Sequence, residues 1–500
     1  MSANLDQLKQ ILADVFDLNR IGSVLGWDQQ TYMPQGGSED RGNQISLVSR
    51  LSHETFTSKK VGELLEALKD EEKQLDPESN DACLIRQARH EYLKATLVPT
   101  EWVAEFSQLT STAQDTWVTA RPQSDFAAFR PYLEKIVEMR KQYSDFFKPY
   151  DHIYDPQLDD FEPGLKTAEV KAIFNELRPQ QVDLLKKISA KTQVDDSFLQ
   201  VPYDEQKQWD FGVEVITAFG YDWKRGRQDR SAHPFTTSFG SGDVRITTRF
   251  DKLGIASALF GTMHECGHAL YDQGIPKDLS RSPLHDGASM AFHESQSRMW
   301  ENLVGRSLPF WSQFYGKLQK TFPTELGGVP LDKFYKGINK VMPSLIRTEA
   351  DEATYNLHIM LRLELEIAML EGSLAVKDLP EAWNKRSQDY LGITPPNNKD
   401  GCMQDIHWSF GGFGYFPTYA LGNLVSLQLW ECILRDIPDL EKEIAAGKFS
   451  GLLAWLRENV HKYGHKYEPQ VLIKKVTGSK IDPNPYIRYL KRKFGEIYGL

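Results

Sequence analysis

Residues 260–274 read FGTMHECGHALYDQG and place His264 and His268 four positions apart. On a helix this spacing puts both imidazoles on one face, one turn apart, where they can bind the same metal ion. Glu265 directly follows the first histidine, so its carboxylate can take a proton from a water molecule on that ion. Two imidazoles and an oxygen ligand suit zinc, with one position left for water. The stretch therefore predicts a zinc peptidase built around a helix.

The residues that precede this motif predict that its helix is buried. Apolar side chains recur at helical spacing in Leu253, Ile255, Ala256, Leu259, Phe260 and Met263. Gly274 and Pro276 provide a stop at the other end, so the helix should be about twenty residues long. The alternative, a surface helix whose histidines bind no metal, is disfavoured by this apolar pattern.

The composition is that of an ordinary globular protein, with 40% hydrophobic and 26% charged residues. A length of 500 residues would by itself suggest two or three domains. The net charge of -10 and the isoelectric point near 5.7 argue against a general nucleic-acid binder. We therefore expect no nucleic-acid partner, while the zinc peptidase motif predicts peptide substrates.

The N-terminal stretch MSANLDQLKQILADVFDLN has an amphipathic helical pattern without a basic region or a continuous apolar run, so we expect no signal peptide. No apolar run in the sequence approaches the length that spans a membrane. The cysteines are widely spaced and form no C-x-x-C pair: Cys83, Cys266, Cys402 and Cys432. This usage fits a reducing compartment, and we expect a cytoplasmic protein with no membrane contact.

Helical periodicity dominates the chain and predicts a mostly α fold, one large helical body in which two lobes could surround a cleft. One of the longest periodic segments covers residues 331–372. The exception is HPFTTSFGSGDVRITTRF, residues 233–250, whose β-branched and aromatic residues surround a Gly-Ser-Gly-Asp turn. This pattern predicts a β-hairpin just before the metal-binding helix. Its edge could pair with an extended peptide, although a hairpin without that role fits the pattern equally well.

The third metal ligand cannot be chosen from spacing alone. Tyr271 and Gly274 occupy the positions where the metzincin pattern requires glycine and histidine, so that class is excluded. The remaining downstream candidates are His285, His293 and Glu294. His293 and Glu294 are adjacent on a second predicted helix, where their side chains point about 100° apart. Either could reach the metal.

Several motifs in this sequence resemble those of one known family, the carboxypeptidase Taq family of metallocarboxypeptidases. They occur in the family's order: HPF (233–235), DVRIT (243–247), HECGH (264–268), HESQ (293–296), IRTEAD (346–351) and GCMQDIHW (401–408). WDQQTYMP at residues 27–34 extends the resemblance to nearly the whole chain. The family is similar in fold to angiotensin-converting enzyme and the neurolysin-type oligopeptidases, which are mostly helical with a deep central groove. We therefore expect one catalytic domain over residues 1–500, with residues 1–220 forming one side of the groove and residues 221–500 the catalytic half.

The resemblance also implies roles for the residues of the metal site. It makes Glu294 the third ligand beside His264 and His268, and Glu265 the general base. His293 then becomes a residue near the substrate. The family likeness implies one zinc ion per subunit, or cobalt in its place, a homodimer, and the release of single residues from peptide C-termini with broad specificity.

Peptide hydrolysis passes through an oxyanion that needs hydrogen-bond donors besides the metal. The stretch QDIHWSFGGFGYFPTY offers His407, Tyr415 and Tyr419. In the related oligopeptidases, a histidine and a tyrosine about a dozen residues apart serve this purpose, which matches His407 and Tyr419. Tyr415 is the second candidate, and packing of a loop is the alternative role for these aromatic residues.

An enzyme that acts at a C-terminus must also bind a free carboxylate, for which the planar guanidinium of arginine is well suited. Arg347 and Arg245 are the candidates, each within a shared motif, and His233 of HPF is a further candidate for substrate contact. Asp351 could orient a liganding histidine or pair with an arginine. An oligoendopeptidase of the same fold would lack the carboxylate anchor, and a non-catalytic metal-binding protein would not need Glu265.

Overall fold

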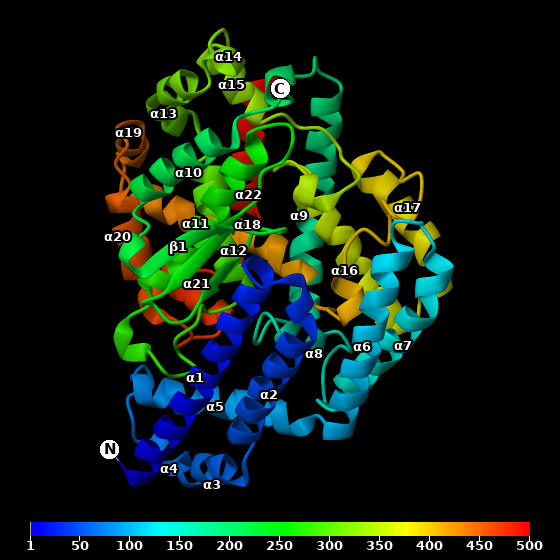
Figure 1. Cartoon of the computed structure of the whole chain (residues 1–500), viewed down its shortest axis with the longest axis vertical. Helices are drawn as coiled ribbons and strands as arrows, with labels where there is room; N and C mark the ends of the chain where they lie inside the picture. Colours follow the sequence, from blue (N-terminus) through cyan, green and yellow to red (C-terminus); the bar gives the residue numbers. More distant parts are fainter. Residues whose placement is uncertain (1) are drawn as a thin grey trace.

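The computed structural model describes residues 2–500, which form a mostly helical body with one small sheet (Figure 1). The chain up to Phe219 forms α1 (Ala3–Thr31), α2 (Ser38–Phe56), α3 (Lys59–Ala67), α4 (Lys69–Glu72), α5 (Asn80–Leu97), α6 (Thr100–Ala120), α7 (Phe126–Asp145), α8 (Asp155–Asp159), α9 (Thr167–Ser189) and α10 (Glu205–Phe219). The helices after the sheet are α11 (Ala256–Gly274), α12 (Met290–Arg298), α13 (Leu308–Thr321), α14 (Pro323–Leu326), α15 (Leu331–Ile338), α16 (Tyr355–Glu371), α17 (Leu379–Leu391), α18 (Phe416–Asp436), α19 (Leu440–Ala445), α20 (Ser450–Asn459), α21 (Pro469–Thr477) and α22 (Asn484–Tyr498). The mostly α fold predicted from the sequence is confirmed.

The sheet consists of β1 (Gly226–Arg230), β2 (Thr236–Ser238) and β3 (Val244–Thr248), in the order β1-β3-β2. β2 runs antiparallel to β3, which confirms the hairpin predicted within residues 233–250. β1 pairs parallel to β3 and was not predicted, because its sequence GRQDR has no alternating apolar pattern. β2 is left as an edge strand beside α11.

α11 is the buried helix predicted from residues 253–273. Its apolar residues Leu259, Phe260 and Met263 are at most 3% exposed and join the main hydrophobic core. The helix contacts β2 and β3 on the sheet, and also α10 and α12. The metal-binding motif therefore lies on a helix that is held from several directions.

The long helical segment expected over residues 331–372 is interrupted. α15 ends at Ile338, α16 begins at Tyr355, and the connection contains only a short 3-10 turn, Arg347–Glu349. Pro343 lies in this connection, and a proline both lacks the N–H that a helix needs and disfavours helical geometry in the preceding residue. The IRTEAD motif consequently lies outside the α-helices, with Arg347–Glu349 in the 3-10 turn.

α12 is packed between α11 and α18, and two glycines permit this close packing. A Cβ atom on Gly267 of α11 would lie 2.6 Å from the Cα atom of Ser297 in α12. On the other side, a Cβ atom on Gly422 of α18 would lie 2.6 Å from the Cβ atom of Glu294. Both distances are shorter than any real contact between carbon atoms. The position of Glu294 thus depends on the absence of a side chain at Gly267 and at Gly422.

The first helix belongs to a separate, smaller hydrophobic cluster. Leu5, Leu8 and Leu12 of α1 pack there against apolar residues of α3 and α5, among them Val61, Leu64, Leu65, Leu84, Ile85 and Ala88. The other end of α1 reaches the sheet, where the Arg245 guanidinium stacks 4.3 Å from the Trp27 ring centroid. α1 is therefore fixed at one end by apolar packing and at the other by a cation–π contact.

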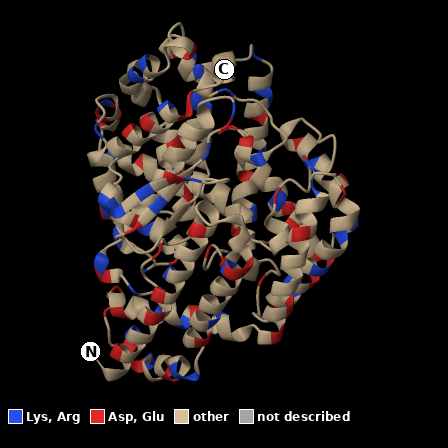
Figure 2. Ribbon diagram, in the orientation of Figure 1, with Lys and Arg blue, Asp and Glu red and all other residues tan. Residues whose placement is uncertain are grey.

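The surface carries both signs of charge. Figure 2 shows Lys and Arg interspersed with Asp and Glu over the whole ribbon. Among residues 2–500, no helix combines the length and apolar character needed to cross a bilayer.

The tight packing of α12 on α11 generates a prediction. Gly267→Ala should destabilise the protein by about 1–3 kcal/mol, because the added methyl group meets the backbone of α12 and forces the helices apart. Gly261→Ala is the matched control on the same helix, since a Cβ atom there has nothing within 4 Å. The Gly261→Ala variant should be as stable as the parent protein or slightly more stable, because alanine has a higher helix propensity than glycine. Thermal or denaturant unfolding of both variants measures the difference, and equal stability of the two would contradict this account of the packing.

Candidate metal centre and active site

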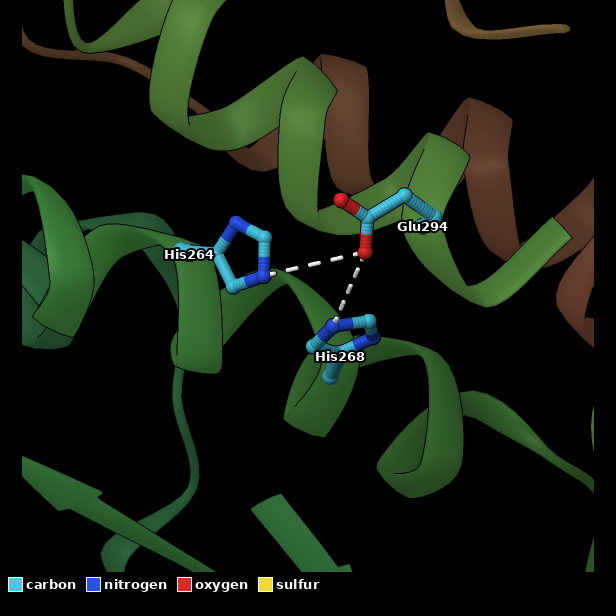
Figure 3. Close-up of side chains that lie close together, drawn as sticks. All are labelled: His264, His268 and Glu294. Carbon is cyan, nitrogen blue, oxygen red and sulfur yellow. Dashed lines mark ion pairs between the residues drawn. The ribbon is translucent and has the colours of Figure 1, made fainter. Parts of the chain in front are cut away.

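Three side chains from two helices converge on one point (Figure 3). His264 and His268 lie one turn apart on α11, and Glu294 reaches toward them from α12. The Glu294 Oε2 atom lies 3.8 Å from the Nε2 atom of His264 and 3.7 Å from that of His268. Of the alternatives that the sequence left open, the structure brings Glu294 to the histidine pair.

This arrangement fits a single divalent metal ion. The three candidate ligand atoms all lie within 4.8 Å of one another. Ligands bound about 2 Å from a metal at tetrahedral angles lie about 3.3 Å apart, so only a small adjustment would be needed. Glu265, Glu294 and Glu301 bring three carboxylates to the site and Arg298 brings one positive charge, so a bound cation would balance the negative charge that remains.

Glu301 orients the first histidine and was missed from the sequence. Its Oε2 atom lies 2.9 Å from the Nδ1 atom of His264. Since a carboxylate only accepts, Nδ1 donates this hydrogen bond and Nε2 keeps a lone pair for a metal. Glu301 lies seven residues after Glu294, which places it on the same helical face and is the signal that could have revealed it. Asp351, considered for such a role, instead accepts hydrogen bonds from the backbone of Met342, Ala353 and Thr354.

Arg298 links the two carboxylates. Its Nε atom donates to Glu294 Oε1 at 2.7 Å, and its Nη1 atom donates to Glu301 Oε2 at 3.1 Å. Burial would raise the pKa of Glu301, but the charge of Arg298 and the hydrogen bond from His264 hold it well below its usual range. Burial alone would lower the pKa of His264. The charge of Glu294 and the hydrogen bond to Glu301 outweigh burial, so the pKa of His264 is raised. The pKa of His268 falls well below its usual value through burial and the neighbouring His264.

Glu265 lies beside the metal ligands with its carboxylate held in place. The residue is 7% exposed, and the Thr236 hydroxyl of β2 donates to its Oε2 atom at 2.7 Å. The same hydroxyl also contacts the Glu265 backbone oxygen at 2.9 Å. Burial raises the pKa of Glu265, against the charge of His264 and the Thr236 hydrogen bond. A carboxylate with a raised pKa both accepts and returns a proton readily, as a general base must.

The predicted oxyanion donors meet at the start of α18. Tyr419 lies in the first turns of this helix, and its hydroxyl is 3.4 Å from the Nε2 atom of His407. Burial raises the pKa of Tyr419 well above its usual value, so the phenol keeps its proton. Burial and the charge of Arg347 lower the pKa of His407 to about 3, so its imidazole is neutral at ordinary pH. Tyr415 directly precedes α18, with its ring 5.3 Å from that of Tyr419.

The candidate metal ligands, Glu265 and the two tyrosines line one cavity of about 450 Å³, the catalytic cavity. It is lined by His264, Glu265, His268, Glu294, Tyr415, Tyr419, residues 234–238, and also Arg20, Asp272, His285, Asp286, Met290, His293 and Thr418. The Nε2 atom of His293 lies 3.7 Å from carboxylate oxygens of Asp272 and Asp286. Burial would lower the pKa of His293, but these two carboxylates raise it. His293 therefore lies beside the substrate space, while His233 is exposed and outside the lining.

Neither predicted arginine lines the catalytic cavity. Arg347 is 6% exposed, donates from Nε to Asp405 Oδ1 at 2.9 Å and from Nη1 to the Tyr355 hydroxyl at 3.1 Å, and stacks 4.9 Å from the Tyr419 ring centroid. Arg245 forms a two-pronged contact with Asp243, at 2.9 and 2.7 Å. Arg347 thus contacts Tyr419, which lines the cavity, but does not reach the cavity itself. Arg245 instead holds Trp27 of α1 against the sheet.

Arg20 is the cavity-lining arginine, and nothing in its sequence context on α1 indicated it. Its Nη1 atom donates to the Ser238 backbone oxygen at 3.0 Å, at the end of β2. Only the folding of α1 against a sheet more than 200 residues further along the chain brings Arg20 to this position.

Comparisons with known proteins show which family the chain belongs to. A family model described as Carboxypeptidase Taq (M32) metallopeptidase matches residues 7–494. The chain belongs to this family. It is 42% identical over 492 residues to Thermostable carboxypeptidase 1 of Thermus thermophilus, covering 96% of each chain. It is 39% identical over 479 residues to Carboxypeptidase 1 of Bacillus subtilis, covering 96% of this chain and 95% of that one.

Solved structures of the M32 family show the same fold. The M32 carboxypeptidase from Deinococcus radiodurans R1 is 41% identical, with a TM-score of 0.97 and complete coverage of both chains. Metallocarboxypeptidase 1 of Trypanosoma cruzi is 30% identical, with a TM-score of 0.94, covering 98% of this chain and 99% of that one. This M32 protein is therefore a metallocarboxypeptidase, a peptide-bond hydrolase whose family implies a metal ion. Its oligoendopeptidase alternative is not favoured.

The metal centre of this M32 protein generates a prediction about two acidic residues. Glu294→Ala should remove most of the bound metal while the helical circular dichroism stays unchanged. Glu301→Gln should instead weaken metal affinity by about ten- to a hundredfold, because the hydrogen bond that orients His264 is lost. Titration against a competing chelator measures both effects. Full metal occupancy in Glu294→Ala would refute this ligand set and turn attention to His293.

Proposed function

We propose that this M32 metallocarboxypeptidase uses zinc to release single residues, with broad specificity, from the C-termini of peptides. The observation that carries the proposal is the convergence of His264, His268 and Glu294 beside Glu265 in one cavity. A binding protein without catalytic activity would have no use for a buried carboxylate positioned next to the metal ligands.

The ligand set supports zinc, with cobalt as the alternative and one ion per subunit. Two imidazole nitrogens and one carboxylate oxygen, with one position open, are typical of catalytic zinc sites. When bound, such an ion lowers the pKa of a water molecule and polarises a carbonyl group.

Glu265 moves the proton in this proposal. Its carboxylate takes a proton from the attacking water and later gives it to the nitrogen of the departing amino acid. The Thr236 hydroxyl, which donates to Oε2 at 2.7 Å, keeps the carboxylate facing the metal ligands. The strand that borders the substrate therefore also orients the general base.

Tyr419 and His407 supply the remaining stabilisation of the oxyanion. Tyr419 lines the catalytic cavity, and its hydroxyl lies 3.4 Å from the Nε2 atom of the neutral His407. A hydroxyl that donates to the developing negative charge stabilises the transition state more than the substrate. Tyr415, which also lines the cavity, is the second donor candidate.

Substrate binding uses the edge of β2. This strand lines the catalytic cavity, so an extended peptide can hydrogen-bond to its backbone. Backbone pairing is insensitive to side chains, which supports broad specificity. His293 is a contact for substrate side chains, and His233 precedes the strand at its other end.

The terminal carboxylate requires a positive charge, and we propose Arg347 for this role, with Arg245 as the alternative. Arg347 packs directly behind Tyr419, so its charge acts close to the catalytic cavity. Both guanidinium groups already pair with a carboxylate, Arg347 with Asp405 and Arg245 with Asp243, so the contact with Tyr419 is what favours Arg347.

We further propose a cytoplasmic homodimer with two halves, residues 1–220 and 221–500, around the groove. The support for a reducing compartment is that Cys83, Cys266, Cys402 and Cys432 are all free and buried. Light scattering coupled to size-exclusion chromatography measures the oligomeric state, and a mass near 57 kDa would refute the dimer.

Glu265→Gln tests the proton transfer. The variant keeps the shape of the side chain and can still accept the Thr236 hydrogen bond, but it cannot carry a proton. Turnover of a short peptide should fall by at least about a hundredfold while the metal content is unchanged. Near-normal turnover by a metal-replete Glu265→Gln sample would end the general-base proposal.

Amidation of the substrate tests the direction of cleavage. Loss of the terminal charge should lower kcat/KM by about thirty- to a thousandfold, while blocking of the N-terminus should have little effect. The Arg347→Ala variant should cleave peptides with a free C-terminal carboxylate poorly. Amidation of the peptide should then lower its kcat/KM little further. Arg245→Ala is the matched control and should keep the full amidation penalty. Amino acids released over time identify the products, and equal cleavage of amidated and free peptides by the unmodified protein would mean an endopeptidase.

A further inference from the structure

A buried carboxylate binds both ends of the loop that separates two of the proposed oxyanion donors. Glu366 of α16 is 0% exposed and is not among the residues that line the catalytic cavity. Its Oε1 atom accepts a hydrogen bond from the indole N–H of Trp408 at 2.8 Å, and its Oε2 atom accepts one from the backbone N–H of Gly414 at 3.1 Å. Trp408 directly follows His407. Gly414 directly precedes Tyr415, so one carboxylate holds the chain beside each of these two residues.

The N-terminal half of the chain holds the same loop from another side. The hydroxyl of Tyr154, a fully buried residue just before α8, donates to the Oε2 atom of Glu366 at 2.5 Å. Gly414 has a φ angle of +89°, which favours glycine. A Cβ atom at this position would lie 2.1 Å from the backbone oxygen of Gln157 in α8. The loop therefore packs directly on α8 and is joined to it through Glu366.

The three donors around Glu366 match the ionised form of its side chain. An indole N–H and a backbone N–H can only donate, and a carboxylate accepts at both oxygens. Burial raises the pKa of Glu366 to about 7, while the three hydrogen bonds and the charge of Arg140 act to lower it. Above this pH the carboxylate is ionised and all three donors are satisfied.

The loop sets the positions of the proposed oxyanion donors, a step that rests on the proposed function. The Tyr419 hydroxyl lies 3.4 Å from the Nε2 atom of His407, and the Tyr415 ring lies 5.3 Å from the Tyr419 ring. His407 precedes the loop, and both tyrosines follow it at the start of α18. A displacement of about 1 Å in a group at the reacting centre can lower the rate by about a hundredfold. The donors therefore depend on a loop that does not shift.

We propose that Glu366 is a positioning residue for catalysis. Its carboxylate fixes residues 408–414, and through them it fixes His407 and Tyr415 at the two ends of the loop. Glu366 contacts neither the substrate nor the candidate metal ligands. Its replacement consequently lowers turnover without loss of metal.

Glu366→Gln tests this role at a pH well above 7. A glutamine can accept hydrogen bonds on one side only, so either Trp408 or Gly414 loses its acceptor. For a short peptide, kcat should fall by about ten- to a hundredfold and KM should change by less than about twofold. Hydrogen–deuterium exchange of the amides of residues 408–414 should become about tenfold faster, because the loop opens more easily. The metal content of the variant should equal that of the parent protein.

Glu364→Gln is the matched control on the same helix. The partners of Glu364 lie on α9 and α17, away from the loop: Arg178, Arg386 and Tyr390. This variant loses buried contacts as well, but its kcat and its exchange rates in the loop should be those of the parent protein. Trp408→Phe keeps an aromatic ring and removes one donor, so it tests the anchor even where Glu366→Gln does not fold. Its kcat should fall and its loop should exchange faster, each by less than in Glu366→Gln.

Tyr419→Phe separates this inference from the proposed function. A large loss of kcat in Tyr419→Phe together with normal kcat in Glu366→Gln and Trp408→Phe would overturn the positioning role. Unchanged exchange in the loop, loss of metal from Glu366→Gln, or an equal loss of kcat in Glu364→Gln would overturn it as well. Normal kcat in Tyr419→Phe with faster exchange and low kcat in Glu366→Gln would uphold the anchor and reject the oxyanion role of Tyr419 in the proposed function.

Discussion

The active site depends on how closely α12 can approach α11 and α18. Glu294 reaches the two histidines because Gly267 and Gly422 leave room for α12 on both sides. Helices normally pack with side chains between them at interaxial distances of 8–10 Å, and small residues at the contact shorten that distance. The candidate metal ligands are thus held by helix backbones in contact, a rigid arrangement that loops would not supply.

Behind the ligands lie paired buried charges. Arg298 links Glu294 to Glu301, and Asp405 joins the guanidinium groups of Arg347 and Arg362 behind Tyr419. Such charges are costly to bury singly, and each pair removes that cost only while its geometry is kept. The side of the cavity with His264, His268 and Glu294 and the side with Tyr419 are therefore each supported by an ion-pair network, and loss of one partner leaves an unpaired charge beside the cavity.

Periodic features of the sequence were the ones that could be predicted. The buried motif helix and the hairpin have regular apolar patterns, and the HExxH spacing by itself places two ligands and Glu265 on one helix. The family resemblance supplied Glu294. β1 was missed because its pairing with β3 overrides a polar sequence, and the helix expected over 331–372 is interrupted around Pro343. Arg20 could not be assigned, because its role arises from a tertiary contact with Ser238, 218 residues away. Glu301 was missed although its spacing from Glu294 was a usable signal.

That separation between Arg20 and Ser238 has a consequence for synthesis on the ribosome. At about 5–20 residues per second, roughly 10–40 seconds pass between the emergence of α1 and that of β2. The first half of α1 can pack early, because α3 and α5 follow it closely in the chain. Its second half can pack on α2, which follows directly, through contacts such as Arg41 with Asp28 and Ser52 with Asn19. Only the side of this half that carries Trp27 and Arg20 must wait for the sheet. The nascent protein therefore exposes that one side of the helix during this interval, and a molecular chaperone could bind it there.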